Sequence, residues 1–128
     1  MKSPRRALII ALAALALAPS GAHAATASCS ESGDVCYSAR KMGGVVRLQF
    51  GTFSFSGRVE ICVSAPRRSK ADCKTFRLRK PDRMGIHALD VAWSKHFPRR
   101  GKGTYRVSFR PTFVEEPFSP RVSFKLRG

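Results

Sequence analysis

The chain has 128 residues, of which 24 are Lys or Arg and eight are Asp or Glu, so its formal net charge at pH 7 is +16. This length is the size of one domain. The positive charge favours anionic partners such as nucleic acid, lipid headgroups or acidic wall polymers, and disfavours cationic ones.

The beginning of the chain has the pattern of a secretory signal peptide. Residues 1–6 form a basic head, an unbroken apolar run covers 7–18, and a small-residue frame follows at 22–24. A membrane-spanning helix needs about 20 apolar residues, more than this run supplies. We therefore expect cleavage after Ala24, with a second possible frame at 25–27. The mature protein is then secreted, extracellular or periplasmic, without an integral membrane segment.

After the signal come short runs in which apolar and polar residues alternate, separated by Gly, Pro and charged residues about every 10–15 residues. Alternation of this kind predicts strands with one buried and one wet face, which is typical of antiparallel sheets. Seven strands are expected, at Val35–Lys41, Val45–Phe50, Arg58–Ser64, Cys73–Lys80, Ile86–Trp93, Thr104–Arg110 and Arg121–Arg127.

The connections carry their own signals. At Gly51 the apolar phase slips by one residue to Phe53 and Phe55, which predicts a β-bulge or a bend. Residues 94–103 are expected to form a loop. Residues 111–120 contain three prolines and cannot form a central strand.

The fold class is therefore all-β. Residues 1–24 are the signal peptide, 25–33 an N-terminal segment, and 34–127 a single antiparallel seven-stranded β-sandwich. The inward phases of the strands give the predicted core: Val46, Leu48, Phe50, Val59, Ile61, Val63, Phe76, Leu78, Leu89, Val91, Trp93, Tyr105, Val107, Phe109, Val122, Phe124 and Leu126.

The four cysteines predict two disulfides, since an even number in a small exported chain is typical of a disulfide framework, although three pairings are possible. We expect local pairing, Cys29 with Cys36 and Cys62 with Cys73. In a hairpin of the strands around residues 62 and 73, both thiols fall opposite each other on the outward face, where a bridge is geometrically possible.

Metal and cofactor sites are not expected. The cysteines are spaced by 7 and 11 residues, and His87 and His96 are scattered, so zinc-ligand spacing is missing. Phosphate-cradling glycine loops are also missing.

The strand pattern resembles the immunoglobulin or fibronectin type III sandwich. Gly103-Thr104-Tyr105 at the start of the penultimate strand is similar to the tyrosine corner of that fold. The chain departs from antibody domains because its cysteines avoid the second and sixth strands and Trp93 is on the fifth. The resemblance implies an architecture and no particular activity.

Catalytic residues are hard to assemble from this sequence. Ser94, His96 and Asp90 could form a nucleophile set, which makes a small hydrolase one alternative, but a nucleophile motif such as G-x-S-x-G is missing. The adjacent Glu115 and Glu116 are expected to be solvated charges. We expect a protein that is not an enzyme.

Basic residues occupy the outward phases of the strands expected to share one sheet, with Glu60 as the single acid among them. Two flanking basic segments, Arg67-Arg68-Ser69-Lys70 and Arg99-Arg100-Gly101-Lys102, add to this charge. Arginine suits bidentate contact with phosphate or carboxylate. The predicted anion-binding face consists of Arg58, Arg77, Arg79, Arg106, Arg110, Arg121, Lys125 and Arg127.

The leading functional hypothesis is a secreted, non-catalytic basic sandwich that binds an anionic wall polymer, another polyanion or an anionic partner at the cell envelope. A second hypothesis is a secreted cationic effector or inhibitor that acts through the loop Lys95–Lys102. A third is a purely structural module, whose arginines follow from base composition and keep their charged groups in water.

Overall fold

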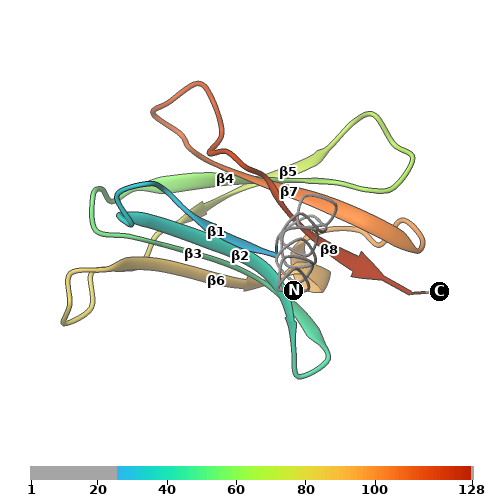
Figure 1. Ribbon diagram of the computed structural model, residues 1–128, viewed down its shortest axis with the longest axis horizontal. Helices are drawn as coiled ribbons and strands as arrows, with labels where there is room; N and C mark the ends of the chain where they lie inside the picture. The colour runs from blue at the N-terminus through green and yellow to red at the C-terminus, as the bar shows by residue number, and fades with distance from the viewer. Residues whose placement is uncertain (1–25, 128) are drawn as a thin grey trace, which may run out of the picture.

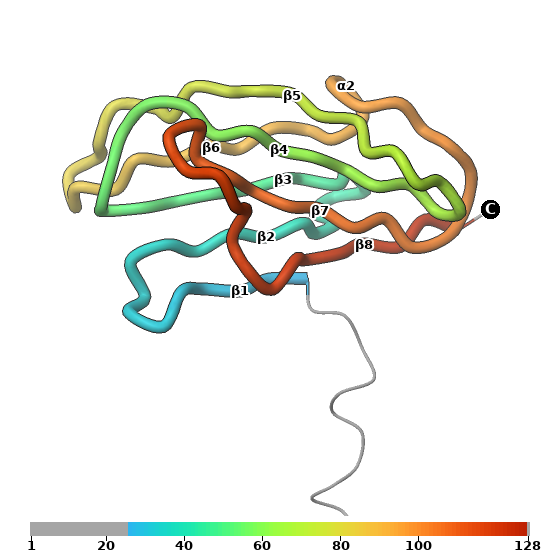
Figure 2. Tube along the Cα trace, turned by 90° about the horizontal axis from the view of Figure 1, so that it is seen from above, coloured from blue at the N-terminus to red at the C-terminus, as the bar shows by residue number. Residues whose placement is uncertain are grey.

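The computed structural model describes residues 26–127, and its strands form two antiparallel sheets packed face to face (Figure 1). The first sheet has the strand order β1-β2-β3-β6, and the second has β5-β4-β7-β8. Figure 2, seen from above, shows the strands of both layers running in similar directions. The strands are β1 Ala27–Cys29, β2 Val35–Met42, β3 Val45–Thr52, β4 Arg58–Ser64, β5 Asp72–Arg77, β6 His87–Ala92, β7 Gly103–Pro111 and β8 Val122–Leu126. The signal peptide expected at residues 1–24 lies outside the described residues.

The described residues contain eight strands, not seven. Each predicted run holds one strand, and β1 is the addition, within the segment 25–33 that we expected to precede the sandwich. It pairs with β2 over only three residue positions, too few for alternation to show in the sequence. The predicted loop at 94–103 also differs, since it begins in the one-turn helix α2, Trp93–His96, which buries Trp93.

The β-bulge predicted at Gly51 is wrong, and the bend that the phase slip also allowed comes two residues later, at Phe53 and Ser54. Strand β3 continues in regular register to Thr52, which pairs with Val35 of β2. Thr52 is 1% exposed, whereas Phe53 is 52% exposed. The Thr52 hydroxyl accepts a hydrogen bond from the backbone N–H of Ser54 at 3.0 Å. Because its hydroxyl has a hydrogen-bond partner, Thr52 can be buried, and it takes the inward position that the sequence pattern predicted for Phe53.

The core between the sheets is the one predicted from the inward phases, with two exceptions. Phe76 and Val91 are only partly buried, because β5 and β6 are edge strands of their sheets. Strand β2 contributes three further core residues, Val35, Tyr37 and Ala39. The Ser38 between Tyr37 and Ala39 is buried as well, and its hydroxyl donates a hydrogen bond to Gln49 at 3.3 Å.

Both predicted disulfides are confirmed. Cys29 faces Cys36, with their Cα atoms 4.0 Å apart, and Cys62 faces Cys73 at 4.1 Å. Each bridge fastens an edge strand, β1 or β5, to its inner neighbour. Closing a loop of about a dozen residues contributes roughly 3 kcal/mol in the chain-entropy model. Edge strands that bury little apolar surface are thus held covalently.

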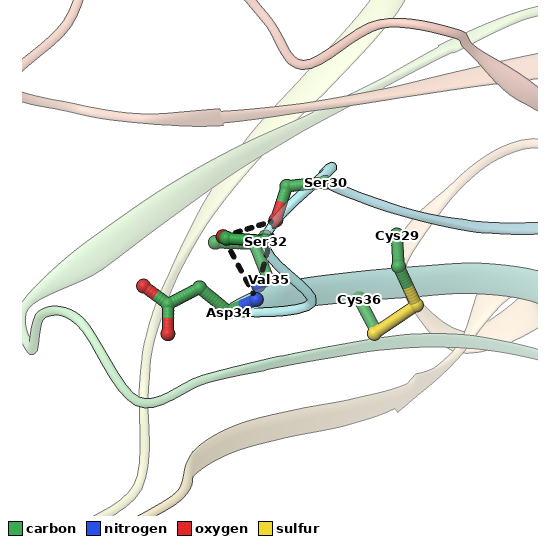
Figure 3. Close-up of a disulfide and its surroundings, with 6 residues drawn as sticks. All are labelled: Cys29, Ser30, Ser32, Asp34, Val35 and Cys36. Atoms are coloured by element: carbon green, nitrogen blue, oxygen red, sulfur yellow. Dashed lines mark hydrogen bonds between the residues drawn. A yellow bond between two sulfur atoms is a disulfide. The ribbon is translucent and has the colours of Figure 1, made fainter.

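The bridge between Cys29 and Cys36 encloses a short, hydrogen-bonded loop (Figure 3). The hydroxyl of Ser30 accepts from the N–H of Val35, and that of Ser32 accepts from the N–H of Asp34, both at 3.2 Å. Side-chain acceptors of this kind fix the turn that brings β1 back beside β2.

Tyr105, at the start of β7, ties the preceding loop to the core. Its hydroxyl donates to the carbonyl of Gly101 at 2.7 Å and accepts from the N–H of Arg100 at 2.8 Å. The ring is completely buried and stacks on Phe124, with centroids 5.1 Å apart. The loop that carries Arg99, Arg100 and Lys102 therefore has a fixed position at the end of the second sheet.

Replacement Tyr105→Phe removes both hydrogen bonds and leaves the N–H of Arg100 without its acceptor. We expect a loss of about 1–3 kcal/mol in the free energy of unfolding, because a buried hydroxyl and its partner are both affected. Urea unfolding followed by tryptophan fluorescence measures this, with Phe124→Leu as a control that changes ring packing only. Unchanged stability of Tyr105→Phe would contradict this role of the hydroxyl.

Candidate anion-binding face

The outward side of the second sheet carries a set of arginines that we call the arginine face. They occupy the outward phases of β4, β5 and β7 and the position just before β8, opposite the buried Val59, Ile61, Val107 and Phe109. The arginine face consists of Arg58, Arg77, Arg106, Arg110 and Arg121.

The other predicted members of this face lie at its margin or elsewhere. Lys125 keeps the outward phase of edge strand β8 and pairs with Thr104 of β7. Lys125 and Arg127 also border a hollow of about 570 Å³ between β8 and β2, together with Arg40 and Lys41. Arg79 follows the end of β5 and crosses to the first sheet, where its N–H donates to the carbonyl of Ala88 at 2.9 Å. It lines a hollow of about 390 Å³ over the outside of that sheet.

Arg110 has a structural partner. Its Nε and Nη2 donate to the same oxygen of Glu60 at 3.2 and 3.0 Å, and its Nη1 donates to the carbonyl of Val114 at 2.6 Å. The guanidinium therefore neutralises the one acid of the face and holds the loop after β7. Its remaining capacity to bind an external anion is smaller than that of its neighbours.

Arg58 and Arg77 stand directly opposite each other on β4 and β5. Both side chains are exposed, and like charges in facing positions on a sheet repel. This pair destabilises the sheet in the absence of an anion, as expected for residues positioned to meet one.

Four arginines, two from a loop and two from the arginine face itself, border a hollow at one end of that face. Arg67 and Arg68 come from the β4–β5 loop, while Arg106 and Arg121 belong to the face itself. The hollow, which we call the arginine hollow, has a volume of about 540 Å³. Ser64, Ser69 and Thr104, which carry hydroxyl groups, also line it.

The two basic segments singled out in the sequence meet at this end of the molecule (Figure 2). Arg100 donates to both carboxylate oxygens of Asp72, at 2.9 and 3.0 Å, and so joins the loop before β7 to the start of β5. Pro66 packs against Gly103, where an added Cβ would lie 2.8 Å from the Pro66 ring. The segment Lys95–Lys102 is therefore fastened to the second sheet.

The carboxyl of Asp72 responds to this cationic surrounding. The hydrogen bonds from Arg100 lower its pKa below the usual range, and the positive charges of Arg100, Arg68 and Lys70 act in the same direction, against a smaller opposing effect of burial. The lowered pKa favours the ionised form of Asp72, whose bonds to Arg100 keep the two loops joined.

The remaining candidate catalytic residues do not form a reactive set. Asp90 accepts from Arg47 at 2.8 Å and from Gln49 at 3.1 Å on the outside of the first sheet. The His96 ring is half-buried and packs edge-on against Phe76, at 5.1 Å between centroids. Within residues 26–127 no hydrogen bond connects Ser94, His96 and Asp90. Glu115 and Glu116 are exposed in the loop after β7.

Glu60, Cys62 and Cys73 are close enough together to suggest metal ligands. Their ligand atoms are already engaged, because the two sulfurs form a disulfide and the carboxylate binds Arg110. These three residues therefore connect strands of the second sheet and do not offer free metal ligands.

Some members of the site were missed by sequence reasoning. Ser64 and Thr104 alternate with the buried Val63 and Tyr105, so their outward phase was visible in the sequence, but hydroxyls carry no charge signal. The bond between Asp72 and Arg100 joins residues 28 positions apart and depends on the packing of two loops.

Comparison with protein-family models, curated proteins and solved structures gives no match for this chain. Among the helices of the described residues, none is long and apolar enough to cross a membrane.

Replacement Asp72→Asn tests the connection between the two loops. The folded-state pKa of Asp72 is lowered, so its stabilising contribution is present above the unfolded-state pKa of about 4 and is lost as pH falls through the folded-state value. We expect the variant to be less stable than the wild type at pH 7, with the difference shrinking below about pH 4. Chemical unfolding across this pH range measures it, and a pH-independent difference would contradict the ionic origin.

Replacement Arg77→Thr tests the repulsion across β4 and β5. Removing one of two facing cations, and supplying a residue that favours strands, should raise the free energy of unfolding by about 0.2–1 kcal/mol at low ionic strength. In 1 M salt the electrostatic part of the gain should disappear, since the screening length falls to about 3 Å. Lys80→Thr, in an exposed turn, is the control. A gain independent of salt would assign the effect to strand propensity alone.

Proposed function

We propose that this protein is a secreted, non-catalytic, immunoglobulin-like β-sandwich that binds an anionic polymer or partner at the cell envelope through the arginine face. The observation that carries the proposal is the separation of chemistry across β4 and β7. Their inward residues are apolar and completely or almost completely buried, whereas their outward residues are cations, hydroxyls and the disulfide-bonded Cys62, with Glu60 as the single acid.

The immunoglobulin-like part of the proposal is supported by the strand order and by Tyr105. Strands β4, β5, β7 and β8 share one sheet, and β2, β3 and β6 share the other. The Tyr105 hydroxyl binds the carbonyl of Gly101 four residues upstream, as the tyrosine corner of such sandwiches does.

The location of the protein is supported by its sulfur chemistry. All four cysteines form disulfides, which persist in oxidising surroundings outside the cytoplasm. This agrees with the signal peptide expected at residues 1–24.

The chemistry of the face favours recognition of charge over recognition of bases. The exposed arginines donate several hydrogen bonds each in a planar arrangement suited to oxyanions. The aromatic rings of β7 and β8 point into the core, where they are unavailable for stacking on a nucleobase. An anion lying across Arg58 and Arg77 also relieves their mutual repulsion.

A salt titration with a 20-base-pair DNA duplex as the probe tests the proposal. Neutralising about five phosphates gives a slope of about −4.5 in log affinity against log salt, which is a loss of roughly 500-fold between 50 and 200 mM. Fluorescence anisotropy of labelled duplex measures this. Absence of binding at 50 mM salt would overturn the proposal as it applies to phosphate polymers.

A pair of charge-matched variants locates the binding surface. Arg77→Gln/Arg106→Gln removes two cations of the arginine face and should reduce the salt slope by about 1.8. Lys80→Gln/Arg83→Gln removes two exposed cations of the turn before β6 and should leave the slope nearly unchanged. Equal reductions would show that net charge, and not the face, governs binding.

A further inference from the structure

We infer that the arginine hollow is a phosphate-binding site that accepts individual phosphate groups of an anionic ligand. This inference rests on the proposed function and gives the arginine face a defined chemical target. It assigns the strongest contacts to one end of the face, around the β4–β5 loop, Arg106 of β7 and Arg121 just before β8. Figure 1 shows this loop, in yellow-green, beyond the end of the sheet at which β7 begins.

The charges around the hollow lack internal compensation. Arg47, Arg100 and Arg110 each form a salt bridge with a carboxylate. Arg67, Arg68, Arg106 and Arg121 form none within residues 26–127, and the hollow that they border contains no acidic residue. The carboxylate of Asp72 is hydrogen-bonded to Arg100, and its interaction with Arg68 is a charge–charge attraction without a hydrogen bond.

The donor set fits phosphate better than carboxylate. A phosphate monoester carries a charge of about −1.5 to −2 at pH 7 and three acceptor oxygens, whereas a carboxylate carries a single charge on two oxygens. Guanidinium groups from several directions match the tetrahedral arrangement of phosphate oxygens. The hydroxyls of Ser64, Ser69 and Thr104 add neutral donors at the same site.

The backbone of the β4–β5 loop is fixed in a costly conformation at this site. Arg67 has a φ of 60°, and it is the one residue other than glycine among the described residues with a positive φ. Residues other than glycine rarely adopt this left-handed backbone conformation, whereas glycine would occupy it without strain. Residues in rarely populated backbone conformations cluster at ligand sites, where the surrounding structure holds them in place.

The loop is also braced before any ligand arrives. Pro66 packs against Gly103, and Arg68 N–H donates to the carbonyl of Ala65 at 3.3 Å. The bond between Asp72 and Arg100 fastens the far side of the loop. Little ordering of the backbone is then required on binding, which favours affinity. With about 540 Å³, the hollow also leaves room for the unit that carries the phosphate.

Matched double variants test the site with inorganic tripolyphosphate as the probe, by calorimetry in 50 mM salt. Arg106→Gln/Arg121→Gln, at the hollow, should weaken binding by about tenfold or more, since each lost charge-assisted contact is large. Arg58→Gln/Arg77→Gln, on the same face but away from the hollow, should weaken it by less than about threefold. Equal losses in the two variants would overturn the site. Equal wild-type affinity for a polyglutamate of the same charge would overturn its preference for phosphate.

Arg67→Gly separates binding from folding. The substitution removes a guanidinium and relieves the left-handed backbone, so thermal stability should be unchanged or higher while tripolyphosphate binding weakens by about tenfold. Arg67→Lys keeps the charge and should restore part of the binding. Undiminished binding by Arg67→Gly would contradict the assignment of this residue.

The outcomes distinguish this inference from the proposed function. If the wild type binds DNA with a steep salt slope but both double variants bind tripolyphosphate equally, binding by the arginine face is retained and the phosphate site at the hollow is rejected. If tripolyphosphate binds at the hollow but the duplex does not bind, the hollow stands and the proposed function is wrong as it applies to phosphate polymers. Vesicles containing phosphatidic acid identify the source of the phosphate, since loss of vesicle binding in Arg106→Gln/Arg121→Gln shows that a lipid headgroup enters the hollow.

Discussion

Burial of alternate residues along β4 and β7 is the constraint on which the rest of the structure depends. Val59, Ile61, Val107 and Phe109 are completely shielded between the sheets. Successive side chains of a strand point to opposite faces, so fixing these residues inside forces their neighbours outside. The arginines of the second sheet share one surface because the core leaves them no other position.

Within residues 26–127, positive charge is balanced by a carboxylate at three places, two on the second sheet and its loops and one on the first sheet. Salt bridges join Glu60 to Arg110, Asp72 to Arg100 and Asp90 to Arg47, and each connects different strands or loops. Partly exposed pairs of this kind contribute little stability individually. Their larger effect is positional, because they determine which arginines are occupied and which remain available to an external anion around the arginine hollow.

Several features followed from the sequence, and the failures are equally informative. Strand positions and both disulfides were accessible because period-two alternation and cysteine spacing are local properties. The bulge at Gly51 was wrongly predicted because Thr52 is a polar residue type and was therefore assigned to the outward side of the strand. In the structure it is buried, with its hydroxyl hydrogen-bonded. Arg79 kept the phase of Arg77, yet the chain leaves the second sheet after β5 and pairs with the first.

The amino-acid sequence by itself determined an all-β chain with two local disulfides and a cationic outward phase, since each of these depends on residues close together along the chain. Only the tertiary structure decided which cations share a surface. Arg67 and Arg121 are far apart in sequence and border one hollow because antiparallel pairing returns β7 and β8 to the end of β4. Which arginines are neutralised depends likewise on loop packing, a long-range property that no local pattern records.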